Sequence, residues 1–179
     1  MSYNVRLFNH YKHLDDVTSE QKIYEFINKE NPDIIAMQEF YLSDLLDIKL
    51  PYKYTKTKLE SNKFGLAIYS KYPIVNSGSL NFKKSANNTI YIDIVKNKDT
   101  IRVYNVHLES LKVNPKKENF GEKDSERLFK RLANGFKKQV NQTELILKHE
   151  YSWKGKKVIC GDFNNTAYSW VYRKIKSDK

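Results

Sequence analysis

The sequence predicts a mixed α/β fold in which helices cover the faces of a sheet. Three observations support this prediction. A helical pattern at residues 18–30 leads into a short apolar strand at 33–37, and two strands with alternating polarity at 90–94 and 101–106 face each other across a short loop. A further apolar strand at 157–160 follows a long helical stretch. Helices that alternate with buried strands, joined to antiparallel pairs, are typical of layered α/β folds.

The first fifty residues contain a strand, a helix and a second strand. We expect the first strand at residues 3–8 and the helix at 18–30, with Thr18 as its N-cap. The nearly continuous apolar run 33–37 is typical of a strand that is covered on both faces. The apolar stripe expected along the helix consists of Ile23, Phe26 and Ile27.

The middle of the chain has the pattern of strands. Apolar runs at 64–69 and 74–75 flank a proline. The strands 90–94 and 101–106 then form a predicted antiparallel hairpin across the polar loop 96–100.

A polar loop rich in lysine, residues 112–123, separates the strands from a long predicted helix. Asp124 or Ser125 is expected to cap this helix, and Gly135 weakens its middle. Apolar residues at a spacing of four are expected to form its buried face: Leu128, Leu132, Phe136 and Val140.

Composition limits the class of protein. The 179 residues are 40% apolar and 30% charged, which is globular rather than disordered and indicates one domain over residues 1–179. The single cysteine, Cys160, excludes an internal disulfide framework and a four-cysteine zinc site. No transmembrane segment and no signal peptide are recognisable, so we expect a cytoplasmic protein unless a targeting segment precedes this sequence.

The net charge of +11 is unevenly distributed. Residues 1–50 hold five basic and nine acidic side chains, whereas residues 51–179 hold 27 basic and 12 acidic ones. This excess favours a polyanionic partner such as nucleic acid, a phosphorylated small molecule or an anionic membrane. The alternative is coding bias, since only five of the 32 basic residues are arginines, as an AT-rich genome would give.

Glu39 directly follows the buried strand at 33–37. Hard cations such as Mg²⁺ bind carboxylate oxygens and usually take one or two of them from the protein. Glu39 is therefore a candidate metal ligand, and the alternative is a solvated side chain that opens the next loop.

The segment Gly161-Asp162-Phe163-Asn164 ends the last predicted strand. Gly161 permits a sharp turn, after which Asp162 could orient a water molecule and Asn164 could donate to a phosphate oxygen. The alternative is an ordinary Asp/Asn turn.

His107 ends the strand at 101–106. Its imidazole could stabilise negative charge on a phosphoryl oxygen, and the alternative is a hydrogen-bonded structural histidine.

Taken together, five segments resemble the endonuclease/exonuclease/phosphatase superfamily, whose members are similar in fold to deoxyribonuclease I. The resemblance runs from residue 2 to about residue 175, and its motifs occur in the family's order. The segments are Ser2-Tyr3-Asn4-Val5-Arg6, Pro32-Asp33-Ile34-Ile35-Ala36-Met37-Gln38-Glu39, Gly65-Leu66-Ala67-Ile68-Tyr69-Ser70-Lys71-Tyr72-Pro73-Ile74-Val75, Tyr104-Asn105-Val106-His107-Leu108 and Gly161-Asp162-Phe163-Asn164.

The resemblance implies a sandwich of two mixed β-sheets with helices on the outer faces. It also implies hydrolysis of a phosphate ester by a water molecule that Mg²⁺ or Mn²⁺ activates. In this family pattern Glu39 is the metal ligand and Asn4 supports the metal and the phosphate. His107 binds the phosphate, Asp162 orients the attacking water and Asn164 contacts the phosphoryl oxygens.

One departure from the family pattern affects the expected activity. Family members continue to another metal-binding aspartate and a final Asp-His pair, whereas no histidine follows Asp162 in this sequence. We therefore expect the domain to be incomplete at its C-terminal end, to lack the final strands and to have weak or no activity.

The predicted function is nuclease-type hydrolysis of phosphodiester bonds. Four tyrosines among the lysines also favour a polyanionic substrate: Tyr52, Tyr54, Tyr69 and Tyr72. One alternative is a non-catalytic remnant that binds nucleic acid or a partner chain. A further alternative is a hydrolase of the phosphoinositide phosphatase or sphingomyelinase type, because fold resemblance does not select the substrate.

Overall fold

A computed structural model describes the chain except for three short segments, and its contacts divide it into two compact units. The described residues are 1–58, 63–113 and 122–177. The first unit consists of Met1–His107 and Lys154–Asp162, and the second of Leu108–Trp153 and Phe163–Lys179. Each unit is built from two separate stretches of chain. The single domain over residues 1–179 stays a prediction.

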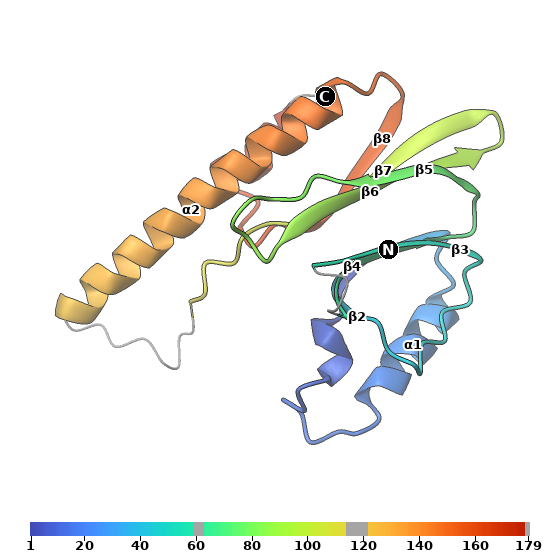
Figure 1. Cartoon of the computed structure of the whole chain (residues 1–179), viewed down its shortest axis with the longest axis horizontal. Coiled ribbons are helices and arrows are strands. Elements are labelled where there is room, and N and C mark those ends of the chain that lie inside the picture. The colour runs from blue at the N-terminus through green and yellow to red at the C-terminus, as the bar shows by residue number, and fades with distance from the viewer. Residues whose placement is uncertain (59–62, 114–121, 178–179) are drawn as a thin grey trace. The chain divides into compact units, whose positions relative to one another are not determined.

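The first unit contains two mixed sheets of four strands each, stacked face to face (Figure 1). In one sheet the order is β1-β2-β4-β3, with β1 parallel to β2 and the other pairs antiparallel. Its strands are β1 (Ser2–Asn4), β2 (Ile34–Tyr41), β3 (Tyr52–Thr57) and β4 (Phe64–Ser70).

In the other sheet the order is β5-β6-β7-β8, and only β7 and β8 are parallel. Its strands are β5 (Ile74–Ser79), β6 (Asn88–Lys96), β7 (Asp99–His107) and β8 (Lys156–Asp162). The predicted hairpin is confirmed as β6–β7, and the predicted two-sheet α/β fold is confirmed with it.

Branched apolar side chains fill the space between the two sheets. Burial of this apolar surface is the main source of stability for such a sandwich. The buried cluster consists of Ala36, Leu66, Ile68, Ile90, Ile92, Ile94 and Val103.

A pair of buried amides interrupts this apolar layer. The Nε2 of Gln38, on β2, donates to the Oδ1 of Asn105, on β7, over 2.6 Å. The Nδ2 of Asn105 donates to the backbone carbonyls of Met37 and Ala67 at 2.8 and 3.0 Å. Both side chains are buried, so these bonds tie β7 directly to the opposite sheet.

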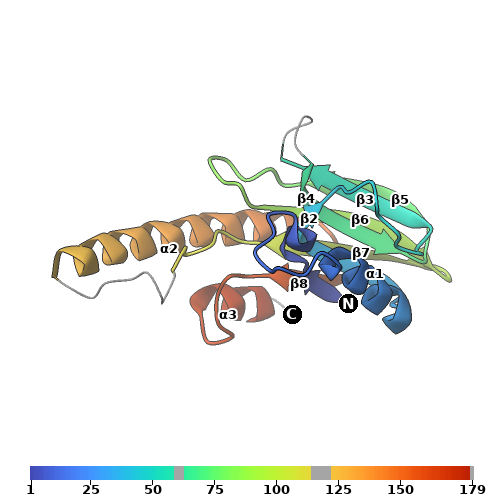
Figure 2. The same cartoon turned by 90° about the horizontal axis from the view of Figure 1, so that it is seen from below.

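The outer face of the β1–β4 sheet is covered by η1 (Arg6–Asn9) and α1 (Ser19–Glu30), which lie in front of it in Figure 2. The predicted stripe on α1 was partly wrong, because Phe26 is 46% exposed and Tyr24 is buried in its place. Thr18 stands at the N-cap position, but its hydroxyl donates to Asp16 over 2.6 Å and does not cap the helix.

The predicted strand at residues 3–8 was also wrong beyond Asn4. Residues 6–9 form a tight turn in which every φ angle lies between 46° and 62°. Such left-handed backbone is costly outside glycine, so the surrounding structure must hold it. The buried ring of Phe8, which packs on Tyr24 and Phe40 at centroid distances of 5.0 and 5.7 Å, supplies that hold.

The second unit contains α2 (Glu122–Tyr151) and α3 (Trp170–Ser177). Because α2 begins at Glu122, the two predicted caps, Asp124 and Ser125, lie within its first turn. Most of the predicted loop at 112–123 lies outside the described residues. No helix in the described part of the chain is both long enough and apolar enough to cross a membrane.

The predicted apolar stripe of α2 is only partly buried, since Leu128, Leu132 and Val140 are half-buried. Phe136 is 44% exposed, and the buried positions are Gly135, Gln139, Gln142, Thr143, Ile146 and Glu150. Leu111 packs so closely on Gly135 that a Cβ there would lie 2.8 Å from its Cδ2. Gln139 and Gln142 bond to the backbone of Glu109 at 2.7 and 2.8 Å, so the polar side chains face the chain segment that follows β7.

We predict that Asn105→Ala lowers the free energy of unfolding by about 1–3 kcal/mol, because it removes the closest acceptor of the buried Gln38 amide and the side-chain donor to the carbonyls of Met37 and Ala67. Urea denaturation measures the change. The control is Asn141→Ala on the exposed face of α2, which should change stability by less than about 0.5 kcal/mol. Equal midpoints and slopes for both variants would contradict the importance of this amide pair.

We predict that Gly161→Ala also destabilises the protein, by about 1–3 kcal/mol. Gly161 has a φ of 141°, and a Cβ there would collide with the backbone carbonyl of Val106 on the neighbouring strand. Gly155→Ala is the matched control, since Gly155 is exposed and is not among the glycines with a positive φ. Thermal melts that shift equally for the two variants would refute the strain argument.

Candidate active site

Glu39 lies at an irregular point of β2. The register between β2 and β4 shifts between Met37 and Phe40, and Glu39 has a φ of 48°. A bulge of this kind re-aims a side chain and is common beside active sites. The half-buried carboxylate therefore leaves the normal alternation of the strand, which the sequence pattern could not show.

Asn4, the last residue of β1, joins two of the predicted site residues. Its Nδ2 donates to Oε1 of Glu39 at 3.0 Å and to Oδ2 of Asp162 at 2.9 Å. Its Oδ1 accepts from the backbone N–H of Arg6 at 3.1 Å, which fixes the orientation of the amide. Residues far apart in the sequence, from both sheets, thus meet at one amide group.

Asp162 and His107 end two neighbouring parallel strands. Their Cα atoms are paired in the β7–β8 register, and both side chains are partly buried. Because the carboxyl ends of parallel strands lie at the same edge, the sheet brings the histidine and the aspartate together. The structure therefore gathers Asn4, Glu39, Asp162 and His107 within the first unit.

The chemistry of this donor set fits a hard divalent cation. The bridging amide engages one oxygen of each carboxylate, and two acidic groups so close together favour a positive charge beside them. Mg²⁺ usually takes one or two carboxylates and keeps several water molecules. Within the described ranges, no group of three or more His, Cys, Asp or Glu side chains could hold a metal ion.

Asn164 belongs to the second unit, where its Nδ2 donates to the carbonyl of Leu108 at 2.9 Å. Its φ is 48°, so the chain turns sharply after Asp162. Its own carbonyl accepts from Gln139 at 3.2 Å. These contacts describe Asn164 within its unit, and its predicted role on the phosphoryl oxygens stays a prediction.

Sequence reasoning assigned no role to the amide pair Gln38–Asn105, which lies one residue before Glu39 and two before His107. The signal that could have indicated this pair is the alternation of side chains along a strand. In β7 the side chains of Val103 and Asn105 share one face, so an amide occupies a position where the alternation predicts an apolar residue.

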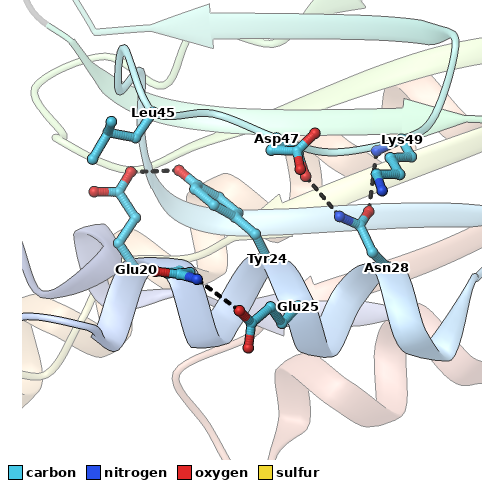
Figure 3. A pocket seen from close by; sticks show the side chains of 8 residues that line it. Glu20, Tyr24, Glu25, Asn28, Leu45, Asp47 and Lys49 are labelled. Atoms are coloured by element: carbon cyan, nitrogen blue, oxygen red, sulfur yellow. Dashed lines mark hydrogen bonds between the residues drawn. The ribbon is translucent and has the colours of Figure 1, made fainter.

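A cavity of about 540 Å³ lies elsewhere, along α1 (Figure 3). Its walls include Glu20, whose carboxylate accepts from the hydroxyl of Tyr24 at 2.5 Å, and Asn28, which bonds to the backbone of Asp47 at 2.8 Å. Burial and this hydrogen bond raise the pKa of Tyr24 well above its usual value. None of the predicted site residues lines this cavity.

Comparison with solved structures shows the same fold in several enzymes and toxins. Beta toxin from Staphylococcus aureus matches with a TM-score of 0.64 and 19% identity, over 99% of this chain and 69% of that one. Sphingomyelinase C from Streptomyces griseocarneus gives a TM-score of 0.65 at 15% identity, over 99% and 68% of the two chains. TDP2 from C. elegans gives 0.61 at 18% identity, over 92% and 47%.

The chain therefore spans between about half and seven-tenths of these solved structures. Among curated protein sequences, no match is found. The family described as Endonuclease/Exonuclease/phosphatase matches residues 1–179. Together with the two mixed sheets, this match shows that the chain belongs to the endonuclease/exonuclease/phosphatase family.

Proposed function

We propose that this chain is a metal-dependent phosphoesterase that hydrolyses phosphodiester bonds, with Mg²⁺ or Mn²⁺ as its cofactor. The observation that carries the proposal is the amide of Asn4, which donates to Glu39 and Asp162 at once. This contact supports a compact site with two carboxylates at the edge where the two sheets end.

Each side chain has a distinct part in the proposed reaction. Glu39, positioned by Asn4, holds the cation, which supplies charge neutralisation and a more acidic water when it is bound. Asp162 accepts a hydrogen bond from the attacking water and orients it. His107 donates an N–H group to a phosphoryl oxygen, where negative charge increases in the transition state.

The charge of the chain favours nucleic acid as the source of the phosphodiester. Residues 51–179 carry 27 basic and 12 acidic side chains, a field that attracts polyanions. The second candidate is a phospholipid hydrolase of the sphingomyelinase or phosphoinositide phosphatase type, which the similarity to a sphingomyelinase C favours. A non-catalytic domain that binds nucleic acid or a partner chain is the third outcome that the experiments below distinguish.

We predict that Glu39→Gln weakens Mn²⁺ binding about tenfold or more, because the variant loses a charged oxygen ligand and keeps the shape of the side chain. Isothermal titration calorimetry measures the affinity without any substrate. Glu25→Gln on the exposed face of α1 is the matched control and should bind Mn²⁺ like the parent chain. Equal affinities of the Glu39→Gln variant and the parent would remove Glu39 from the metal site.

We predict that hydrolysis of bis(p-nitrophenyl) phosphate requires added metal and falls about 100-fold or more in Asp162→Asn, because the amide does not accept the water proton. The exposed Asp47→Asn variant is the control and should retain the parent rate. A parent chain that binds Mn²⁺ but shows no metal-dependent turnover would contradict the hydrolase proposal and support the non-catalytic alternative.

A further inference from the structure

Four aromatic rings gather on the surface of the first unit, and one of them, Tyr41, is close in sequence to Glu39. We call them the aromatic cluster, which consists of His10, Tyr11, Tyr41 and Phe64. Tyr41 ends β2 and is paired in register with Phe64, the first residue of β4, while the other two rings come from the loop after η1. Three separate chain segments therefore contribute to it.

The rings contact one another in stacked, tilted and edge-to-face arrangements. His10 stacks on Tyr41 at a centroid distance of 4.1 Å and an interplanar angle of 28°. Tyr41 lies 5.2 Å from Phe64 at 39°, and Tyr11 lies 5.9 Å from Phe64 at 33°. Two further contacts are edge-to-face, since His10 meets Tyr11 and Phe64 at an interplanar angle of 67° and centroid distances of 5.3 and 5.9 Å. The rings therefore form a compact cluster whose faces point in several directions.

The cluster is open to solvent. Tyr11 is 58% exposed, His10 is exposed, and Tyr41 and Phe64 are only partly buried. The neighbouring rings of Phe8 and Tyr24 show what burial in this unit looks like, since they are 3% and 4% exposed. Exposed rings contribute less to the core, and Tyr11 has the exposed surface that a ligand would contact.

The backbone of the loop is held in place before any ligand binds. Residues 6–9 and Lys12 have left-handed φ angles. The side chain of Asn9 bonds to the N–H and the carbonyl of Leu14, at 3.0 and 2.9 Å, and closes the loop. A preorganised surface loses less conformational entropy when it binds.

A lysine beside the rings affects which charge a ligand can carry. The ammonium of Lys63 lies 5.9 Å from the Tyr41 ring centroid, and the backbone N–H of Leu42 bonds to the carbonyl of Lys63 at 2.8 Å. Lys63 also lies 3.6 Å from Asp44, but that carboxylate is almost fully exposed, so the pair is weak. The cavity that His10 lines also has acidic residues in its wall, Asp15, Asp16 and Glu20, so the positive charge at Lys63 is local. It favours a single anionic group, such as one phosphate, beside the Tyr41 ring.

The cluster lies next to the proposed reaction site. Tyr41 follows Glu39 by two residues on β2, so at most about 7 Å of chain separates their Cα atoms. A flat group stacked on the cluster is therefore within one monomer of a phosphate at Glu39. Bases in a duplex are covered on both faces, so only an unpaired base can stack on these rings.

We propose that the aromatic cluster is a stacking platform for an unpaired base of single-stranded nucleic acid, beside the phosphodiester that the site hydrolyses. This inference rests on the proposed function and adds the class of substrate. Base–aromatic stacking tolerates every base, because each has a π-face, so the platform selects single strands over duplexes and has no sequence preference.

The test is binding of a twelve-nucleotide single-stranded DNA, labelled with fluorescein, by the full chain in EDTA. EDTA removes the metal, so binding is measured without hydrolysis. A failure of the Mn²⁺-binding prediction would therefore count against the proposed function and not against the aromatic cluster as a binding surface. Tyr11→Ala should weaken binding about 5- to 100-fold, the scale of one stacked base, and Tyr11→Phe should restore it. Tyr11 is exposed, so its replacement leaves the core intact.

Two further measurements separate stacking from charge. The salt dependence of binding should have the same slope for the parent and Tyr11→Ala, because stacking releases no counterions. Tyr168→Ala is the matched control, since Tyr168 is 89% exposed and lies outside the cluster, and it should bind like the parent. Proper folding of each variant is verified by its thermal melt.

Three results would overturn the proposal. The first is no binding of the single strand by the parent, or equal binding by Tyr11→Ala. The second is tighter binding of the matching duplex than of the single strand. The third is binding of phosphatidylcholine vesicles that Tyr11→Ala abolishes, which would assign the cluster to a lipid surface.

Discussion

The hydrogen bond between the side chains of Gln38 and Asn105 is the constraint on which the site depends. Packing of branched apolar side chains brings two sheets together but tolerates sliding, because dispersion contacts have little direction. A buried amide pair has fixed geometry and is costly to leave unsatisfied. At 2.6 Å, this bond sets the position of β2 against β7, and therefore of Glu39 against His107 and Asp162.

Much of the fold could be predicted because burial leaves a periodic trace in the sequence. The apolar run before Gln38 indicated a covered strand, and the alternating segments around Tyr91 and Tyr104 indicated a hairpin, which the β6–β7 pairing confirms. The errors arose where tertiary contacts override local preference. The anchored ring of Phe8 turns a predicted strand into left-handed backbone, and the chain beside Leu111 makes a polar face of α2 the buried one.

The candidate site was predictable in its residue types but not in its geometry. Polar residues at strand ends indicated Glu39, His107 and Asp162, and the family resemblance added the role of Asn4. The bulge at Glu39 and the double contact of Asn4 depend on long-range pairing, with the two bonds of the amide spanning 35 and 158 positions in the sequence. No periodicity in one strand records such contacts.

The strained backbone of Glu39 is supported by the residues on either side of it. Glu39, in left-handed backbone, would cost free energy in an isolated strand, yet Phe40 beside it is fully buried and Gln38 before it is held by Asn105. Gln38 and Phe40 fix the strand, and the carboxylate of Glu39 between them accepts a hydrogen bond from Asn4. The same strand continues to Tyr41, whose ring begins the aromatic cluster. A single strand thus positions both the carboxylate proposed to hold the cation and the ring proposed to hold the base, and the rigidity that the first requires is transmitted to the second.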